Sequence, residues 1–336
     1  MSDKSGPTTI YDVAERAGVS ITTVSNALNQ PSRVSAKTLE RVLAVVDELG
    51  FTPKAAAVSH ARKGVGRIGV LAPFTSYESF RTRLTGVLQA CAGRNVEVVV
   101  FDQESAAEST SPLLSSLPAT GRLDGLLLMG VPLEDAMVER LLQRELPTVL
   151  VDSHHRKLPS VNVDDEHGGY LAGEYLVSQG HRRLAFVSER QQSMQFLSQG
   201  QRRLAGFTKA LVDAGLGEDS IRHVITTHDI EGGRRAAAEM LTWDALPDAV
   251  FAHFDDIAVG LLSGFRGNGR QVPDDVAVMG YDDGPLADAL DITTVRQPLA
   301  ETGRAGTELL LDLIAAPGTG ARQLLLPVEL VVRESA

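Results

Sequence analysis

The first fifty residues place apolar side chains at the three- and four-residue spacing of short helices. The earliest of these runs comprises Ile10, Val13, Ala14 and Ala17. This spacing predicts an amphipathic helix. Thr9 directly precedes the run and can cap its first turn, and Gly18 follows it with a residue that tolerates the positive φ of a tight turn.

The sequence predicts a second and a third helix, each with a capping residue followed by apolar residues at helical spacing. Ser20 is the expected N-cap of the second helix, whose inward face carries Val24 and Leu28. Ser35 is the expected N-cap of the third helix, which Gly50 ends. The pattern therefore predicts three short helices around one small core.

The second helix carries mostly short polar side chains on the face opposite its apolar residues. These outward positions are Ile21, Thr22, Ser25, Asn26 and Asn29. Hydroxyl and amide groups of this size suit base edges and phosphate oxygens in a DNA major groove. A generic three-helix domain with a solvated polar face would show the same pattern, so the pattern permits DNA binding without requiring it.

From residue 67 onward, short apolar runs alternate with helical stretches. A first series comprises Ile68–Ala72, Val96–Phe101, Gly125–Met129 and Thr148–Val151, and a second comprises Leu184–Val187, His223–Ile225, Ala249–Ala252 and Val276–Gly280. Apolar runs that alternate with helices indicate parallel β–α–β winding. We therefore predict an all-helical head joined to two similar, doubly wound α/β lobes. Ligands of such folds bind beyond the carboxyl ends of the strands, here in the cleft between the lobes.

The formal net charge of −11 argues against a nucleic-acid partner until its distribution is considered. Residues 1–64 carry eight Lys/Arg and six Asp/Glu, a net charge of +2, whereas the remainder carries −13. DNA affinity depends on the local neutralisation of phosphates. The charge distribution therefore allows the head to bind DNA.

The composition also bears on where the protein acts. No run approaches the roughly 18 apolar residues that a membrane helix needs, and the first nine residues lack an apolar signal core. One cysteine, Cys91, excludes an intramolecular disulfide and fits a reducing compartment. We expect a cytoplasmic, nucleoid-associated protein with no membrane partner.

No arrangement of a nucleophile beside a base stands out in the chain, so we do not expect an enzyme. His154 and His155 are adjacent, and on an extended segment they would point to opposite sides, which disfavours a metal pair. The glycine-rich segments 231–234 and 264–269 do not form a GxGxxG motif after a strand. We expect no catalytic residue, no metal and no cofactor.

The head resembles the DNA-binding head of lactose-repressor-type (LacI/GalR) bacterial regulators. The similarity covers TIYDVAERAGVS, TVSNALN and VSAKTLERVLAVVDELGF without a gap. The resemblance implies that the second helix enters the major groove and that Ile21, Thr22 and Asn26 choose the bases. It also implies that phosphates are contacted by Thr9, Ser20, Thr23, Ser25, Asn29, Ser35 and Thr38.

The same resemblance implies a head of residues 8–53 and a hinge helix with its linker at 54–66. The family's hinge helix wedges an apolar side chain, usually leucine, into the minor groove. That position is His60 here, with Lys54 and Ala57 as further contacts. A histidine can enter a narrow minor groove, but it is a poorer wedge than leucine, so we expect a reduced operator bend. A plain basic linker is the alternative.

The body, residues 67–336, resembles the periplasmic-binding-protein-like core of these regulators. The matching segments include GHRRLAFV, QRRLAGF, VPDDVAVMGYDD and TTVRQP. The resemblance implies that the chain crosses between the lobes three times. The first lobe would contain residues 67–163 and 296–326, and the second 164–294 and 327–336.

Two kinds of side chain are candidates for binding an effector. Arg203 matches the arginine with which the family holds an effector hydroxyl or carboxylate, and its planar fork suits bidentate recognition; a surface helix charge is the alternative. Asp152 and Asp282 each follow a strand, where a carboxylate would accept sugar hydroxyls. Asp283 is the alternative to Asp282.

Aromatic side chains could form the walls of such a site. Phe254 stands where sugar-binding relatives often carry a small polar residue, and its ring could stack on a sugar or a planar effector. Tyr77 and Phe80 could add further walls or belong to the core.

Together these implications predict a sequence-specific transcriptional repressor switched by a small effector, a sugar or sugar derivative. A single small head offers little interface, and a two-fold palindromic operator requires a two-fold protein, so we expect a homodimer. A solute-binding transport protein would share the body but not the head. A sugar-modifying enzyme would need a catalytic arrangement that the sequence lacks.

Overall fold

A computed structural model of the chain describes residues 8–51, 66–103, 112–131, 133–190, 198–217, 220–318 and 321–336. The chain divides into two compact units. The first comprises residues 1–73, 87–160 and 304–322, and the second comprises 74–86, 161–303 and 323–336. The head belongs to the first unit, and residues 74–86 group with the second. The lobe boundaries predicted above stay a prediction.

The head consists of the three predicted helices, α1 (Ile10–Ala17), α2 (Ile21–Asn29) and α3 (Ala36–Glu48), with a short 3₁₀ turn at Pro31–Arg33. Their inward faces form one core that includes Val13, Val24, Leu28, Leu43 and Val46. Gly18 ends α1 with φ of 63°, which a residue with a Cβ adopts at a cost. The predicted three-helix head is confirmed.

A first six-stranded sheet has the order β11-β5-β4-β3-β1-β2; strands β1 to β4 belong to the first unit, whereas β11 and all but the first residue of β5 group with the second. Its strands are β1 (Gly66–Ala72), β2 (Val96–Asp102), β3 (Gly125–Met129), β4 (Thr148–Val151), β5 (Ser160–Val163) and β11 (Gln323–Leu326). The helices that alternate with them are α5 (Glu78–Cys91), α6 (Pro112–Thr120), α7 (Asp135–Gln143) and α13 (Leu299–Ala315). The pairings β1–β2, β1–β3 and β3–β4 are parallel.

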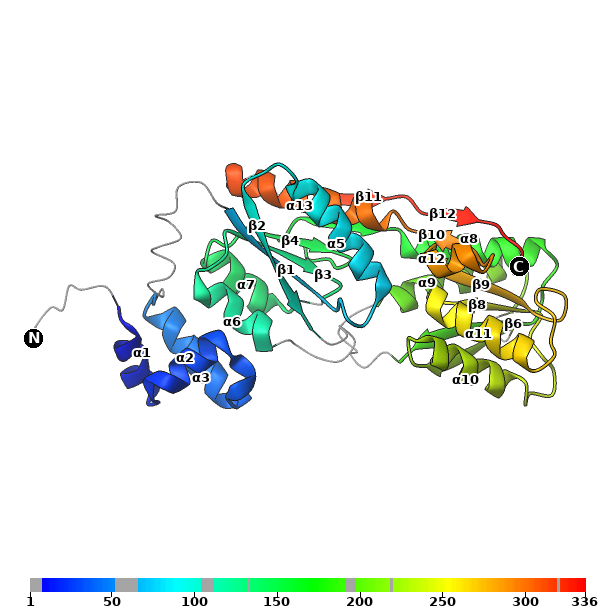
Figure 1. Ribbon diagram of the computed structural model, residues 1–336, viewed down its shortest axis with the longest axis horizontal. Helices are drawn as coiled ribbons and strands as arrows, with labels where there is room; N and C mark the ends of the chain where they lie inside the picture. Colours follow the sequence, from blue (N-terminus) through cyan, green and yellow to red (C-terminus); the bar gives the residue numbers. More distant parts are fainter. Residues whose placement is uncertain are drawn as a thin grey trace, which may run out of the picture. The chain divides into compact units, whose positions relative to one another are not determined.

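Helices cover both faces of this sheet (Figure 1). Leu126 and Leu128 of β3 pack in one cluster with Leu117 of α6 and Leu141 of α7. The intervening Leu127 faces the other side, where Gly306 of α13 approaches it. Because successive strand residues point to opposite faces, β3 is apolar on both, as a parallel strand between two helical layers must be.

The second unit repeats this plan in the order β12-β10-β9-β8-β6-β7. Its strands are β6 (Leu184–Glu189), β7 (Ile221–Thr226), β8 (Ala249–Ala252), β9 (Ala277–Asp282), β10 (Thr293–Arg296) and β12 (Glu329–Val331). Its helices are α8 (Asp165–Ser178), α9 (Gln199–Asp213), α10 (Ile230–Met240), α11 (Asp255–Gly267) and α12 (Pro285–Ala289). The strands pair in parallel except β12, which runs antiparallel to β10.

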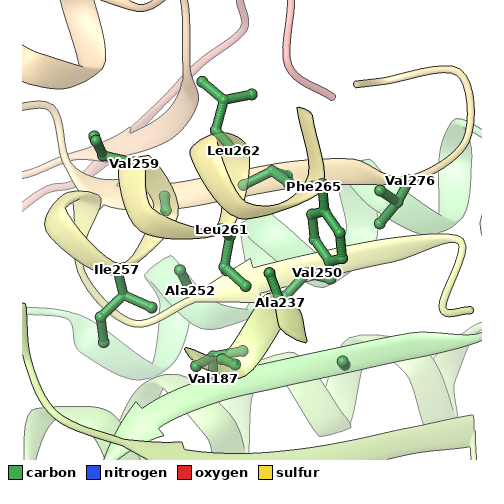
Figure 2. Close-up of a cluster of buried hydrophobic side chains, with 14 of the residues drawn as sticks. Val187, Ala237, Val250, Ala252, Ile257, Val259, Leu261, Leu262, Phe265 and Val276 are labelled. Carbon is green, nitrogen blue, oxygen red and sulfur yellow. The ribbon is translucent and has the colours of Figure 1, made fainter. Parts of the chain in front are cut away.

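Each face of the second sheet has its own core. Val187 and Val250 pack against α10 and α11 in the cluster shown in Figure 2, with Leu261 and Phe265 of α11 at its centre. Phe186, on the opposite face, packs with α8 and α9. These residues are fully buried, and a large apolar side chain contributes about 1.5–3 kcal/mol when it is removed from water.

Glycines bring the helices of each covering pair close together. A Cβ at Gly169 of α8 would lie 1.9 Å from the carbonyl oxygen of Arg203, and one at Gly206 of α9 would lie 1.8 Å from that of Glu166. On the other face, a Cβ at Gly260 of α11 would lie 2.1 Å from a carbonyl oxygen of α10. These helix pairs therefore pack backbone against backbone, which a side chain at any of the three glycines would prevent.

All eight strands predicted from apolar runs are present, and the predicted two-lobed α/β class is confirmed. Four further strands, β5, β10, β11 and β12, were not predicted. They are three or four residues long, and they include polar or exposed positions such as Asn162 and Leu325. Their strand conformation depends on pairing with the sheet edges, which local periodicity does not report.

Candidate functional site

The outer face of α2 is accessible. Ile21 is 40% exposed, Thr22 and Asn29 are exposed, and Asn26 is half-buried. Thr23 and Ser25 are also half-buried, and the amide of Asn29 donates to the carbonyl oxygen of Ser25 at 2.9 Å. The predicted base-reading positions therefore lie together on one helix face, free of the head's own core.

The predicted phosphate contacts include all three N-caps of the head. The side chains of Thr9, Ser20 and Ser35 each accept a hydrogen bond from a backbone N–H in the first turn of their helix. The hydroxyl groups of Thr23 and Thr38 lie 2.8 Å from those of the cap serines. Helix N-termini with spare N–H groups suit phosphate oxygens. Lys54, Ala57 and His60 lie outside the described residues.

The second unit contains a cavity of about 450 Å³. It lies where β8 and β9 end and the following helices begin, which is the usual place for a ligand in a parallel sheet. Its lining comprises Tyr77, Glu78, Ser79, Arg81, Thr82, His228, Ile230, Phe254, Asp255, Asp256, Asp282, Gly284, Pro285, Leu286 and Leu299. Of the predicted effector residues, Tyr77, Phe254 and Asp282 are among them.

Aromatic rings form one side of the cavity. The ring centroid of Tyr77 lies 5.4 Å from that of Phe254 and 4.7 Å from that of His228. Phe80 meets Tyr77 edge-on at 6.0 Å, but it is buried beneath the guanidinium of Arg83 and does not line the cavity. Phe80 thus supports the aromatic wall from behind.

Asp255 and Asp282 bring two carboxyl groups to the cavity. Asp255 accepts hydrogen bonds from the backbone N–H of Gly284 at 2.7 Å and from the hydroxyl of Thr294 at 2.7 Å. Burial raises the pKa of Asp255 well above its usual range, and repulsion from Asp282 raises it further. Asp282 accepts a hydrogen bond from the amide of Gln297 at 2.5 Å.

Backbone geometry sets the direction of the strand-end aspartates. Asp282 has φ of 120° and Asp152 has φ of 53°, both in the region that favours glycine. Asp152 belongs to the first unit, where it is buried after β4. Asp283, the alternative to Asp282, pairs with Arg296 and Arg333 instead. Strained aspartates at strand ends are typical of binding sites.

Arg203 is buried and is not among the lining residues of the cavity. Its Nε donates to Asp165 at 2.8 Å, one terminal nitrogen donates to the carbonyl oxygen of His253 at 2.6 Å, and the guanidinium lies 3.6 Å from the ring centroid of Tyr281. Burial is the largest single influence and opposes the charge, but the attraction of Asp165, Tyr281 and Asp282 together outweighs it and raises the pKa of Arg203. With 2% exposure, Arg203 is not a surface helix charge.

Glu189 joins the aromatic wall to a buried histidine. It accepts a hydrogen bond from the hydroxyl of Tyr77 at 2.8 Å, and it lies 3.9 Å from the Nε2 of His253, beyond hydrogen-bond range. Burial works against ionisation of Glu189, but its polar neighbours His253, Tyr77 and His228 together outweigh burial and lower the pKa of Glu189. Burial lowers the pKa of His253 to about 4, so this ring is neutral at pH 7.

Comparison with known proteins identifies both parts of the chain. Residues 9–54 match the model described as "Bacterial regulatory proteins, lacI family", and residues 174–336 match the "Periplasmic binding protein-like domain". The ribose operon repressor of Haemophilus influenzae is 33% identical over 97% of this chain and 98% of its own length. The repressor PurR of Photobacterium profundum is 30% identical over the same shares. The chain belongs to the lacI family of bacterial regulatory proteins.

Solved structures of family members have the same fold. The lac repressor dimer bound to operator matches with a TM-score of 0.70 and 27% identity, over 98% of this chain and 99% of that one. A lacI-family regulator from Enterococcus faecium with bound ribose matches with a TM-score of 0.72 and 29% identity, over 80% of this chain and 98% of that one. This lacI-family member is a DNA-binding transcriptional regulator, and the relatives are named as regulators and repressors, not as enzymes.

Sequence reasoning missed several lining residues of this family member. Glu78, Asp255, Asp256 and His228 were not predicted, although the two aspartates directly follow Phe254. The position of Asp255 and Asp256 just after a predicted strand was the signal from which these two residues could have been predicted. Over the described part of the chain, no cluster of three or more metal-ligating side chains is present, and no helix is long and apolar enough to cross a membrane.

Asp255 should make stability depend on pH. A carboxyl group whose pKa is raised by folding keeps its proton in the folded chain over a pH interval in which the unfolded chain has lost it, so stability falls as the pH rises through that interval. Asp255→Asn is expected to reduce this fall, because an amide cannot ionise and can still bond to Gly284 and Thr294. Urea unfolding between about pH 5 and pH 8 measures it. An unchanged slope, equal to that of the exposed control Asp274→Asn, would contradict the assignment.

Proposed function

We propose that this regulator is a homodimeric repressor that binds a palindromic operator and changes its operator affinity when a sugar or sugar derivative enters the cavity of the second unit. The exposed polar face of α2 carries the DNA-binding part of this proposal. A repressor that acts on chromosomal DNA would work in the cytoplasm, at the nucleoid.

The base-reading role falls to Ile21, Thr22 and Asn26. Side chains of this length reach base edges when the N-terminal part of their helix enters the major groove. The capped N-termini of α1, α2 and α3 would position the head on the phosphates. The caps Thr9, Ser20 and Ser35 are proposed for that role, with Thr23, Ser25, Asn29 and Thr38 beside them.

A homodimer follows from the size of the head. One three-helix head buries too little DNA surface for high specificity, whereas two heads on a two-fold site double the contacts. The relative solved with operator is a dimer by its description. Lys54, Ala57 and His60 of the connecting segment remain proposed minor-groove contacts.

The effector assignment rests on the cavity. Carboxyl groups of Asp255 and Asp282 beside the rings of Tyr77 and Phe254 combine hydrogen-bond acceptors with a flat apolar surface, which is how proteins hold sugar rings. Relatives of known structure contain ribose or cellobiose. Asp152 and Arg203 are proposed as further contributors, Arg203 through its contacts with the segment that carries Phe254. Coupling would be reciprocal: the operator must change effector affinity by the same factor.

The experiment that tests the function combines two steps. Bound sites are first selected from random DNA with the full chain, and sugars are then screened for a change in binding to the selected site. We expect a palindromic consensus and at least one sugar that shifts the affinity. Binding that ignores DNA sequence would reject the proposal.

Asn26 offers a local test of base reading. Asn26→Ala should remove a bidentate amide contact, weaken binding to the selected operator by about 1–3 kcal/mol and relax the preference at one base pair in each half-site. Competition binding on operators with single base changes measures this effect. Asn268→Ala, an exposed asparagine of the second unit, is the matched control. A uniform loss on all DNA sequences would instead make Asn26 a phosphate contact.

A further inference from the structure

The cavity of the second unit carries more acidic than basic groups. Glu78, Asp255, Asp256 and Asp282 contribute carboxyl groups, whereas Arg81 is the one permanently positive side chain among the described lining residues. The Nε of Arg81 donates to Glu78 at 2.8 Å. The single positive charge is therefore already paired with a carboxylate of the same wall.

The acidic groups already repel one another. Burial raises the pKa of Asp256, and repulsion from Glu78 raises it further. Burial and repulsion from Asp282 raise the pKa of Asp255 as well, so this carboxyl resists ionisation, and the negative charge of the lining falls on Glu78, Asp256 and Asp282. A further negative group placed among these side chains would add to the repulsion, whereas a neutral hydrogen-bond donor would be attracted to their oxygens.

The other basic side chains near the cavity are engaged elsewhere. Arg203 is buried in its ion pair with Asp165, and His228 lies 3.8 Å from the carboxylate of Glu189. The N-terminus of α11 would by itself favour an anion, but its first turn carries two acidic residues. Among the described residues around this cavity, each basic side chain already has an acidic neighbour, so none is left to attract an anionic ligand.

The aromatic wall adds a second requirement that is independent of charge. The rings of Tyr77, Phe254 and His228 lie with centroids 4.7 Å and 5.4 Å apart, measured from Tyr77. Such a wall favours a ligand with a flat, apolar ring face. The lining therefore fits a ligand whose ring has an apolar face and carries hydrogen-bond donors along its edge.

We infer that the effector is a neutral or amino-bearing sugar, and that this cavity rejects sugar acids and sugar phosphates. The inference rests on the proposed function, in which the cavity holds the effector. A pyranose would place its ring face against Phe254 and Tyr77 and donate its hydroxyls to Asp255 and Asp282. An amino group would gain further from the acidic lining.

Calorimetric titration of the full chain with matched sugars tests the inference. The probes are glucose, glucosamine, glucuronate and glucose 6-phosphate, with the corresponding galactose set. In each set that binds, we expect the acid and the phosphate to bind at least about tenfold more weakly than the neutral or amino sugar at low salt. This difference in affinity should become smaller at about 0.5 M salt, because salt screens the repulsion between the ligand and the acidic lining.

A single substitution tests whether the lining of the cavity causes the difference in affinity between acidic and neutral sugars. Asp256→Asn removes one negative charge with little change in volume and should narrow the gap between the acid and the neutral sugar. Asp213→Asn, on the exposed face of α9 and paired with Lys209 outside the cavity, is the matched control and should leave the gap unchanged. A gap that persists unchanged in Asp256→Asn would overturn the electrostatic explanation.

The outcomes separate this inference from the proposed function. An acid or a phosphate that binds as tightly as its neutral counterpart, while still shifting operator affinity, would overturn the inference and leave the repressor intact. If no sugar of either set binds, the pyranose ligand inferred here is wrong, and the repressor function is unaffected. Specific operator binding is measured separately by site selection, and it depends on α2 and not on the cavity.

Discussion

Truncation of Arg203 to alanine is expected to lower the free energy of unfolding of the second unit by about 3–5 kcal/mol. The change would leave the carboxylate of Asp165, which is 5% exposed, without its positive partner. It would also remove the guanidinium from the ring of Tyr281 and from the carbonyl oxygen of His253. Urea unfolding of the full chain measures the loss.

A double substitution separates the ion pair from simple packing. Arg203→Met with Asp165→Leu removes both charges and keeps most of the volume, so it should recover much of the stability that Arg203→Ala loses. Arg202→Ala, at the half-buried neighbouring position, is the matched control. If Arg203→Ala and Arg202→Ala were equally stable, the buried pair would not hold this part of the fold together.

Leu43→Ala is expected to unfold the head and abolish operator binding while the second unit keeps its own unfolding transition. Leu43 is 2% exposed in the centre of the head's core, and a buried leucine replaced by alanine costs about 2–5 kcal/mol. A domain of this size has little stability to lose, because it buries a small share of its surface.

Hydrogen exchange of head amides, together with operator titration, follows the effect of Leu43→Ala. Glu40→Ala lies on the exposed face of the same helix and should change neither measurement. Unchanged protection of α1 and α2 in Leu43→Ala, with normal operator affinity, would mean that the head does not depend on this core.

Much of the architecture was predictable because it follows from local patterns. The caps Ser20 and Ser35, the turn at Gly18 and the eight strands with apolar runs all carry their signal within a few neighbours along the chain. The short strand β10 does not, since its Thr293–Arg296 sequence becomes a strand only beside β9.

The binding site was less predictable for the same reason. Arg203 was expected to reach an effector, and its buried partner Asp165 lies 38 residues away on another helix. No periodicity indicates that such a pair will form. Asp282 was found because it stands at a strand end, and Phe254 was found through the family resemblance, whereas His228 and Glu78 line the cavity through the arrangement of helices around the sheet.

The glycine contacts of the second unit have a mechanical consequence. Where Gly169 and Gly206 let two helices touch through their main chains, no layer of side chains between them can change rotamer and absorb a displacement. Gly260 creates the same condition on the opposite face of the sheet. A push delivered by a ligand at the strand ends would therefore move sheet and helices together as a stiff block, and little of the displacement would be lost inside the lobe.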